Sequence, residues 1–191
     1  MDITEQKALL RSEIRTLRRS VSDGERKNAS LAVAEKLLSL KGILDAEYVL
    51  AYMPMKYELD ILPTVKELSA LGKKVVFPLC IEDGGLKLYI PSKENGFTVG
   101  AYGILEPDVR TAEEVPYERI DAVILPAIGF DRSLSRLGQG GGYYDRLLSK
   151  VGCFTVAVGF DCQLVDRVPT EPTDRRVDAI VTPKELILAQ I

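Results

Sequence analysis

Residues 123–148, which read VILPAIGFDRSLSRLGQGGGYYDRLL, constrain the fold of this chain more than any other stretch. The apolar residues 123–125 predict a buried strand, and a helix is expected to begin near Tyr143. The loop that leads into this helix carries Arg136, Gly138, Gly140, Gly141 and Gly142. A strand, a glycine-rich turn and a helix in this order present backbone N–H groups and a positive helix end to an anion.

Two interpretations of this loop stay open on spacing alone. The string matches neither the G-x-x-x-x-G-K-[ST] phosphate loop nor the dinucleotide fingerprint, and clustered glycines are also typical of a mobile turn. Phosphate binding is favoured by Arg136, whose planar fork suits phosphate oxygens. Asp145, in the first turn after the glycines, could hold a metal beside the phosphates. Tyr143 and Tyr144 would otherwise simply pack the start of the helix.

The composition excludes several classes of site. The 191 residues contain no histidine, which removes Ser-His and Cys-His catalysis, so acid–base chemistry must use carboxylates, Tyr, Lys or the substrate. Three scattered cysteines form no zinc pattern and indicate a reducing, cytoplasmic location. A net charge of −3 argues against a general nucleic-acid or membrane binder, and no apolar run is long enough to span a bilayer.

Strands and helices are expected to alternate along the chain. Helices are predicted at 4–20, from the capping box Ser22-Asp23-Gly24-Glu25 to a stop at Gly42, and from Asp60 to 71 with Gly72 as its stop. The first two helices are expected to pack together on one side of a sheet, with Leu10, Ile14, Leu17 and Val21 buried. Strands are predicted at 48–52, 74–77, 86–90, 155–158 and 179–182. This order predicts one α/β domain over residues 1–191, with a largely parallel sheet and helices on both faces.

The strings LPAIGFD and RLGQGGGYYDRLL together resemble the signature of the 5-formyltetrahydrofolate cyclo-ligase family, also called methenyltetrahydrofolate synthetases. The resemblance covers nearly the whole chain and implies a three-layer α/β/α, Rossmann-like fold. Members usually place a glycine about two residues before the arginine, where this chain has Leu134. Some members also carry basic residues among the glycines, where this chain has Gln139 and Gly141.

The resemblance implies an ATP site at two places in the chain. The K-x-x-L-R pattern of Lys7, Leu10 and Arg11 matches the family's contacts to ATP phosphates, although a basic helix face is more often simply solvated. No such role falls to Arg15 or Arg18. The loop and helix start supply the other ATP-binding residues: Arg136, Leu137, Gly138, Gln139, Gly140, Gly141, Gly142, Tyr143 and Tyr144. The catalytic roles fall to Arg136 and Asp145.

The resemblance also implies a folate site and a magnesium site. In the Y-M-P…E-x-D pattern, Met53 lines the pterin pocket and Glu58 contacts the pterin, whereas the residues alone permit an ordinary solvated loop carboxylate. Tyr102, in a G-I-x-E-P stretch, is a candidate for stacking on the pterin, or part of an ordinary excursion. Asp174 of the P-x-x-x-x-D-x-x-V-D element matches a magnesium ligand, which Asp145 would join, and Asp178 opens the next strand. A turn-capping role is the alternative for Asp174.

The implied reaction is the ATP-dependent cyclisation of 5-formyltetrahydrofolate to 5,10-methenyltetrahydrofolate, with release of ADP and phosphate. ATP is then the co-substrate, Mg²⁺ the cofactor, and the partners are small molecules, with no nucleic acid, membrane or obligate protein partner. Phosphoryl transfer asks mostly for positioning and charge neutralisation, which suits a chain without histidine. Two other classes stay open: a different phosphate- or nucleotide-using enzyme on this architecture, such as a sugar-phosphate isomerase, and a non-catalytic folate- or nucleotide-binding module.

Overall fold

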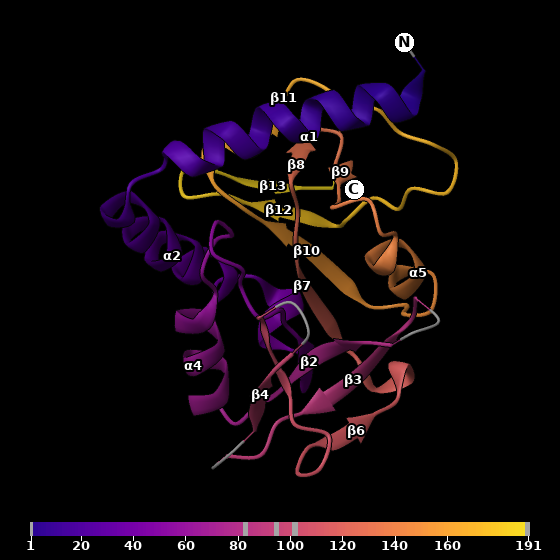
Figure 1. Ribbon diagram of the computed structural model, residues 1–191. Helices are drawn as coiled ribbons and strands as arrows, with labels where there is room; N and C mark the ends of the chain where they lie inside the picture. The colour runs from indigo at the N-terminus through magenta and orange to yellow at the C-terminus, as the bar shows by residue number, and fades with distance from the viewer. Residues whose placement is uncertain (1, 82–83, 94–95, 101–102, 190–191) are drawn as a thin grey trace.

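The computed structural model describes residues 2–81, 84–93, 96–100 and 103–189, and its centre is a mixed β-sheet (Figure 1). Within these residues the strand order is β13-β12-β10-β7-β1-β2-β3-β6. The inner strands run parallel and are β12 (Ala179–Val181), β10 (Phe154–Val158), β7 (Ala122–Pro126), β1 (Tyr48–Leu50) and β2 (Lys74–Cys80). The antiparallel strands at the edges are β13 (Leu186–Leu188), β3 (Leu86–Ile90) and β6 (Glu113–Val115). The largely parallel sheet is therefore confirmed.

The inner strands are rich in apolar residues because both of their faces are buried. Val49, Ile124 and Val156 belong to one buried cluster, whereas their neighbours Leu50 and Leu125 belong to a second cluster on the opposite face. Successive side chains of a strand point to opposite faces of the sheet, and here the side chains on both faces are apolar. The two clusters make the sheet the middle layer of a sandwich.

Helices cover the two faces unequally (Figure 1). The first cluster is covered by α2 (Asp23–Leu37), α3 (Lys41–Leu44) and α4 (Leu62–Ala70) through Val33, Leu37, Ile43 and Leu68. Among the described residues, the opposite face is covered by the short helix α5 (Tyr143–Leu148), through Leu147, together with the 3₁₀ turn η1 (Tyr117–Arg119). Helices therefore lie on both faces, as the three-layer fold requires.

The predicted helix signals have mixed outcomes. The capping box of Ser22 and Glu25 is confirmed at the start of α2. Asp60 accepts a hydrogen bond from the Leu62 amide at 2.8 Å, and Gly72 follows α4 at φ +80°. The prediction that α2 runs to Gly42 is wrong, because α2 ends at Leu37 and Gly42 lies inside α3. A Cβ on Gly42 would lie 2.4 Å from the Phe154 ring, so this glycine allows close packing against β10.

The helix α1 (Ile3–Ser20) does not pack beside α2 on a face of the sheet, so that prediction is also wrong. It crosses the carboxyl ends of the parallel strands above a small second sheet (Figure 1), built from β11 (Leu164–Val165), β8 (Gly129–Asp131) and β9 (Arg136–Leu137). The turn η2 (Asp161–Gln163) leads into β11. Ile14 packs there on Ile128, Leu137 and Val168. The chain thus closes the top of its sheet with its own first helix.

The buried face of α1 differs from the predicted apolar stripe. Lys7, Ile14 and Arg18 are its buried residues, whereas Leu17 is 49% exposed. The two cations are hidden because partners far along the chain reach them, as described below. A helical wheel assigns Leu17 to the interior on hydrophobicity alone and has no information about such partners.

The segment between β3 and β6 forms a hairpin of its own. Strands β4 (Phe97–Val99) and β5 (Leu105–Pro107) pair antiparallel, and Phe97 meets Phe77 edge-on at 5.1 Å between ring centroids. The predicted strand at 86–90 is confirmed as β3, which pairs antiparallel with β2 on one side and with β6 on the other. Tyr102 lies outside the described residues. Among the residues described, no helix has both the length and the apolar character needed to cross a bilayer.

Candidate active site

A cavity of about 540 Å³ opens at the carboxyl ends of the parallel strands, under α1. Its walls come from α1, from the loops after β1 and β7, from strands β2 and β3, from the glycine loop with α5, and from residues 171–174. In open α/β sheets this edge is where ligands bind. The predicted site residues that line it are Lys7, Arg11, Glu58, Arg136, Leu137, Gly138, Gln139, Gly140, Gly141, Gly142, Tyr143, Tyr144, Asp145 and Asp174.

The glycine loop joins β9 to α5. At two of its positions the backbone has a conformation that only glycine adopts without strain. Gly140 has φ +109° and Gly142, the residue before α5, has φ +66°. An L side chain is disfavoured at both angles. The side chain of Arg146 returns to this loop, where its Nη2 donates to the carbonyls of Gly141 at 2.8 Å and Gly84 at 2.6 Å. The loop is therefore tied to the turn between β2 and β3.

Arg136 and Asp145 form the charged pair at the base of the loop. Arg136 is 6% exposed, and its Nη2 donates to Asp145 Oδ1 at 2.7 Å. Asp145 Oδ1 also accepts the amide of Arg175 at 3.3 Å. Burial lowers the pKa of Arg136, although the neighbouring Asp145 opposes this shift. Among the described residues the buried Arg136 Nε has no hydrogen-bond partner, so the guanidinium retains an unused donor beside the cavity.

Lys7 and Arg11 reach the cavity from the buried face of α1. Lys7 is 7% exposed and pairs with Asp174 Oδ2 at 2.6 Å and with Glu171 Oε2 at 2.7 Å. Burial alone lowers the pKa of Lys7, but its hydrogen bonds to Asp174 and Glu171 outweigh that effect and leave the pKa raised. One turn on, Arg11 Nε donates to the carbonyl of Gly138 at 2.8 Å. The α1 cations are thus directed at the glycine loop and the acidic segment facing it.

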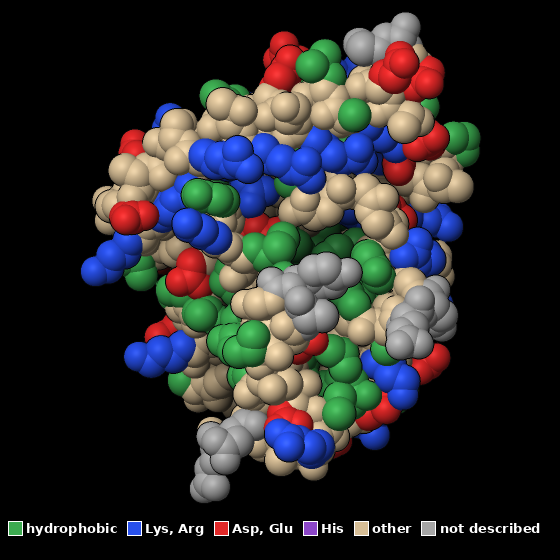
Figure 2. All heavy atoms as spheres, viewed as in Figure 1, with side chains coloured by type: hydrophobic (Ala, Val, Ile, Leu, Met, Phe, Trp, Pro, Cys, Tyr) green, Lys and Arg blue, Asp and Glu red, His purple; other side chains and the backbone are tan. Residues whose placement is uncertain are grey.

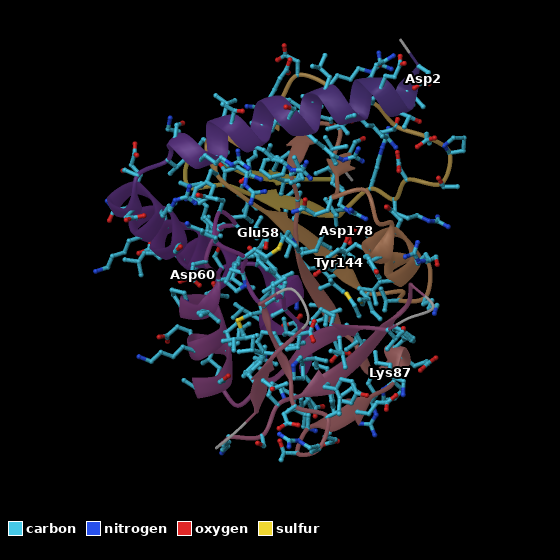
Figure 3. The ribbon with its side chains drawn as sticks, in the orientation of Figure 1. Asp2, Glu58, Asp60, Lys87, Tyr144 and Asp178 are labelled. Atoms are coloured by element: carbon cyan, nitrogen blue, oxygen red, sulfur yellow. The ribbon has the colours of Figure 1, made fainter. Side chains whose placement is uncertain are left out.

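Glu58 supplies a carboxylate on the opposite wall. Its Oε2 accepts the Met55 amide at 3.1 Å, and its Oε1 accepts from Gln139 Nε2 at 3.4 Å. Burial raises the pKa of Glu58, while the Met55 amide, the charge of Arg18 and the Gln139 amide partly offset the shift. Figure 3 shows Glu58 and Tyr144 in the middle of the molecule beneath α1. Burial raises the pKa of Tyr144 well above its usual value, so its phenol stays neutral.

Comparison with known proteins identifies the family of this chain. A model of the 5-formyltetrahydrofolate cyclo-ligase family matches residues 3–183. The chain belongs to this family. The cyclo-ligase of Escherichia coli K12 is 30% identical over 178 residues, which cover 91% of this chain and 98% of that protein. The cyclo-ligase of Mycolicibacterium smegmatis is 32% identical over 189 residues, which cover 96% of each.

Solved structures agree with this assignment. The 5,10-methenyltetrahydrofolate synthetase of Aquifex aeolicus superposes with a TM-score of 0.84 and 34% identity, covering 95% of this chain and 92% of that one. The Mycoplasma pneumoniae synthetase, at 22% identity and a TM-score of 0.75, supports the fold. The resemblance and the α/β architecture are both confirmed.

Leu134, where cyclo-ligases usually have glycine, keeps the backbone conformation that glycine favours. Its φ is +66°, and among the described residues it is the only non-glycine residue with a positive φ. Its amide donates to the carbonyl of Asp131 at 3.0 Å, and its own carbonyl accepts the Val177 amide at 3.1 Å. The side chain, 8% exposed, packs in the second core cluster. Burial of the leucine therefore offsets the strain of the turn, and the loop entrance is retained.

The two other predicted folate contacts are Met53 and Tyr102. Met53 packs against the first core cluster and does not line the cavity. Tyr102 falls outside the described residues. The sequence analysis in turn missed several wall residues, which are Thr4, Pro78, Cys80, Leu86, Pro126, Ala127, Ile128, Arg146, Glu171 and Thr173. Of these, Glu171 had a signal: it is the acidic residue of the same P-x-x-x-x-D element as Asp174.

The carboxylates of the cavity suit a magnesium ion that arrives with a nucleotide. Mg²⁺ is typically held by one or two carboxylates plus phosphate oxygens and water, not by a full protein cage. Asp145 and Asp174 line the same cavity, and among the residues described no cluster of three or more acidic or other metal-binding side chains is present. Both aspartates are paired with cations, Arg136 and Lys7. This donor set fits a nucleotide-borne ion better than a permanently bound one.

Proposed function

We propose that this chain catalyses the ATP-dependent cyclisation of 5-formyltetrahydrofolate to 5,10-methenyltetrahydrofolate, with release of ADP and phosphate. One observation carries the proposal: a single cavity unites a glycine-rich, arginine-bearing loop with a buried carboxylate on the opposite wall. The first is suited to a triphosphate and the second to the N–H groups of a pterin. The family of this chain has the same reaction in its name.

The nucleotide end of the cavity is built from the loop and α1. We assign the phosphates to the backbone of Gly138, Gly140, Gly141 and Gly142, with Arg136 supplying a buried fork whose Nε is unused in the described residues. Lys7 and Arg11 would add charge from above. Leu137, Gln139, Tyr143 and Tyr144 complete the proposed ATP contacts. Mg²⁺ carried by the nucleotide would meet Asp145 and Asp174, where it neutralises phosphate charge.

The folate end is assigned to Glu58. A carboxylate accepts hydrogen bonds from two adjacent N–H donors, which is the pattern that the pterin ring offers. The apolar walls on this side come from Pro78, Leu86 and Ile128, which suit the flat ring. Because burial raises the pKa of Glu58, its capacity to accept hydrogen bonds from the pterin is lost at a higher pH than for an ordinary glutamate.

The chemistry then requires positioning more than a strong base. The formyl oxygen attacks the γ-phosphorus of ATP, and ADP leaves with the electron pair of the broken P–O bond. The N5 lone pair makes the product an iminium phosphate, and N10 attacks its carbon and loses a proton. Phosphate departs with the former formyl oxygen, leaving the methenyl cation. Arg136, Lys7 and Arg11 hold the transferring phosphoryl group, and Glu58 fixes the ring so that the formyl oxygen faces it.

The small-molecule substrates and the free cysteines Cys80, Cys153 and Cys162 are compatible with a reducing cytoplasm, which is the location we propose. No protein or nucleic-acid partner is needed for the reaction.

The test is a spectrophotometric assay of the purified chain with 5-formyltetrahydrofolate and MgATP. We expect absorbance of 5,10-methenyltetrahydrofolate to grow, with one ADP released per product. ADP release that does not require reduced folate would indicate a different nucleotide-using enzyme. Binding of both ligands without product would indicate a binding module. Isomerisation of a sugar phosphate without ATP would place the chain in the other enzyme class.

A further inference from the structure

The cations that line the cavity under α1 fall into two classes. Lys7 and Arg136 form ion pairs with carboxylates. Arg11 and Arg146 form no ion pair with any of the described residues. Figure 2 shows Lys and Arg side chains gathered along α1, the helix that carries Arg11, whereas Arg146 belongs to α5. The two unpaired guanidinium groups therefore reach the cavity from different helices.

Arg11 and Arg146 both bond to the backbone of the glycine loop. Arg11 Nε donates to the carbonyl of Gly138 and Arg146 Nη2 to the carbonyl of Gly141, each at 2.8 Å. A Cβ added to Gly142 would lie 2.8 Å from Arg146 Nη1, so the arginine side chain also crosses the end of the loop. The loop is thus held near both of its ends by arginine side chains.

The loop has little else to fix its position. Among the residues described, no backbone–backbone hydrogen bond involves residues 138–141. Glycine restricts the backbone less than any other residue, so such a loop is not ordered by its own sequence. Its amides are also left without protein acceptors in the described part of the chain, which is the state required for binding an anion. The position of these amides therefore depends on side chains that hold the neighbouring carbonyls.

Arg146 differs from Arg11 in that it also joins the loop to a second segment. Its Nε and Nη2 donate to the carbonyl of Gly84, in the turn between β2 and β3, at 3.1 and 2.6 Å. Its guanidinium lies over the Tyr143 ring, 5.1 Å from the centroid. Holding a long, exposed side chain in one rotamer costs conformational entropy, which these contacts offset. The result is a fixed connection between the glycine loop and the β2–β3 turn.

We infer that Arg146 is a positioning residue for the nucleotide, which fixes the glycine loop to the β2–β3 turn so that the loop amides are preorganised for the triphosphate. The inference rests on the proposed function, because it takes the loop as the phosphate site. A lysine at this position would keep the charge but would lose the planar set of donors that bonds Gly84 and Gly141 while stacking on Tyr143. The geometry of the guanidinium, and not its charge alone, is therefore required.

The first test compares the KM values of both substrates in the wild type, Arg146→Ala, Arg146→Lys and an Arg167→Ala control. Arg167 is exposed and does not line the cavity. We expect both Arg146 variants to raise the KM for MgATP about tenfold, equivalent to ~1.4 kcal/mol, with the folate KM and the thermal midpoint nearly unchanged. The control should resemble the wild type. A normal KM for MgATP in Arg146→Lys, or equal increases for both substrates, would overturn the inference.

The second test reaches the same connection from the turn. Gly84 has φ +78°, and a Cβ there would lie 3.3 Å from Arg146 Nη2, so Gly84→Ala strains the turn and crowds the guanidinium. We expect MgATP to bind about threefold more weakly, and the effect to disappear when Arg146 is already alanine. Gly72→Ala is the matched control, because Gly72 has φ +80° and open space around it. Unchanged MgATP affinity in Gly84→Ala, or fully additive effects, would overturn the inference.

Calorimetric titration with MgATP alone separates this inference from the proposed function, since it needs neither folate nor turnover. Equal MgATP affinity in the wild type and in Arg146→Ala would overturn the inference. A wild type that binds MgATP, with the expected loss in Arg146→Ala, but forms no 5,10-methenyltetrahydrofolate would overturn the proposed function alone. A wild type that does not bind MgATP would overturn both.

Discussion

Lys7 in the first helix and Asp174, 167 residues further along the chain, are joined by an ion pair of 2.6 Å. Glu171 completes the contact at 2.7 Å. Lys7 is assigned to the phosphates and Asp174 to the magnesium ion they carry, so the two proposed ligands neutralise each other across the cavity. In the proposed complex with MgATP, Lys7 would exchange carboxylate oxygens for phosphate oxygens, and the two acids would be available to hold the divalent cation. The charges of Lys7, Asp174 and Glu171 would then have partners both with and without nucleotide.

The first prediction concerns the basic face of α1. Lys7→Ala and Arg11→Ala should each weaken MgATP by ~1–3 kcal/mol, the range of charge-assisted hydrogen bonds, and should leave folate binding nearly unchanged. Arg18→Gln should leave MgATP affinity unchanged, because Arg18 does not line the cavity. Isothermal titration of each variant with MgATP is the measurement, and Arg19→Gln serves as an exposed control on the same helix. Equal losses in all four variants would mean that diffuse electrostatics, not contact, attracts the nucleotide.

The second prediction concerns Asp145. Asp145→Asn should lower kcat about a hundredfold, which corresponds to an activation free energy ~3 kcal/mol higher. The reason is that the proposed Mg²⁺ ligand loses its negative charge at the place where phosphate charge develops. The asparagine oxygen can still accept from Arg136, so the fold should survive. Turnover at saturating magnesium is the measurement, with Asp166→Asn, an exposed aspartate outside the cavity, as the control. Near-normal turnover in Asp145→Asn would remove Asp145 from the catalytic assignment.

The third prediction is a pH dependence at Glu58. Because burial raises its pKa, Glu58 takes up a proton at a higher pH than an ordinary glutamate, and its acceptor capacity for the pterin is lost as pH falls. The KM for folate should therefore rise on acidification while the KM for ATP changes little. Glu58→Gln should have a high and pH-independent folate KM. Parallel changes in both KM values would show that Glu58 serves the fold or both ligands.

The same shift makes a prediction for stability. A carboxyl whose folded pKa is raised binds protons more tightly in the folded state, so its ionisation disfavours folding. The cost is absent below the unfolded pKa of ~4.3, develops as pH rises and is complete above the folded pKa. Glu58→Gln should thus unfold at a higher temperature than the wild type near pH 8, and the difference should vanish below about pH 4. A variant less stable at pH 8 would contradict this reasoning.

The last prediction concerns the turn at Leu134. Leu134→Ala removes the buried side chain but keeps an unfavourable φ, whereas Leu134→Gly removes the side chain and relieves the angle. Both variants should be destabilised, but the glycine variant should be the more stable of the two by about 1 kcal/mol, judged from the left-handed penalty of ~1–2 kcal/mol. Urea unfolding midpoints measure the order. At Leu88, buried in strand β3 without positive φ, the order should be reversed, since glycine weakens a strand.

The strands and the glycine loop could be predicted because their signals are local. Residues 123–125 and 156–158 are apolar without interruption, and Gly140 and Gly142 stand where the backbone has a positive φ. The face of α1 could not be predicted, because Lys7 and Arg18 are buried by Asp174 and by the Tyr57 carbonyl, which lie far away in the sequence. The small sheet of β8, β9 and β11 was also missed, since strands of two or three residues show no measurable period.

At the site, the family resemblance located residues that the local pattern left ambiguous. Glu58 had the plain alternative of a solvated carboxylate, and its contact with Gln139 comes from a segment 81 residues further along the chain. The cavity between α1 and the loop after β1 could not be predicted from the sequence for the same reason. Arg15 and Arg18 read as part of a solvated face until the loop after β1 is placed beside them.

The position of α1 has a consequence for the order in which the protein is made. The helix precedes its packing partners in the chain and leaves the ribosome before them, since Ile128, Leu137 and Val168, on which Ile14 packs, come from the later part of the chain. Contacts so distant in sequence form late in folding. A nascent chain released before Val168 would carry the glycine loop without the helix that covers it. Synthesis must therefore pass Val168 before α1 can take up the binding role proposed for it.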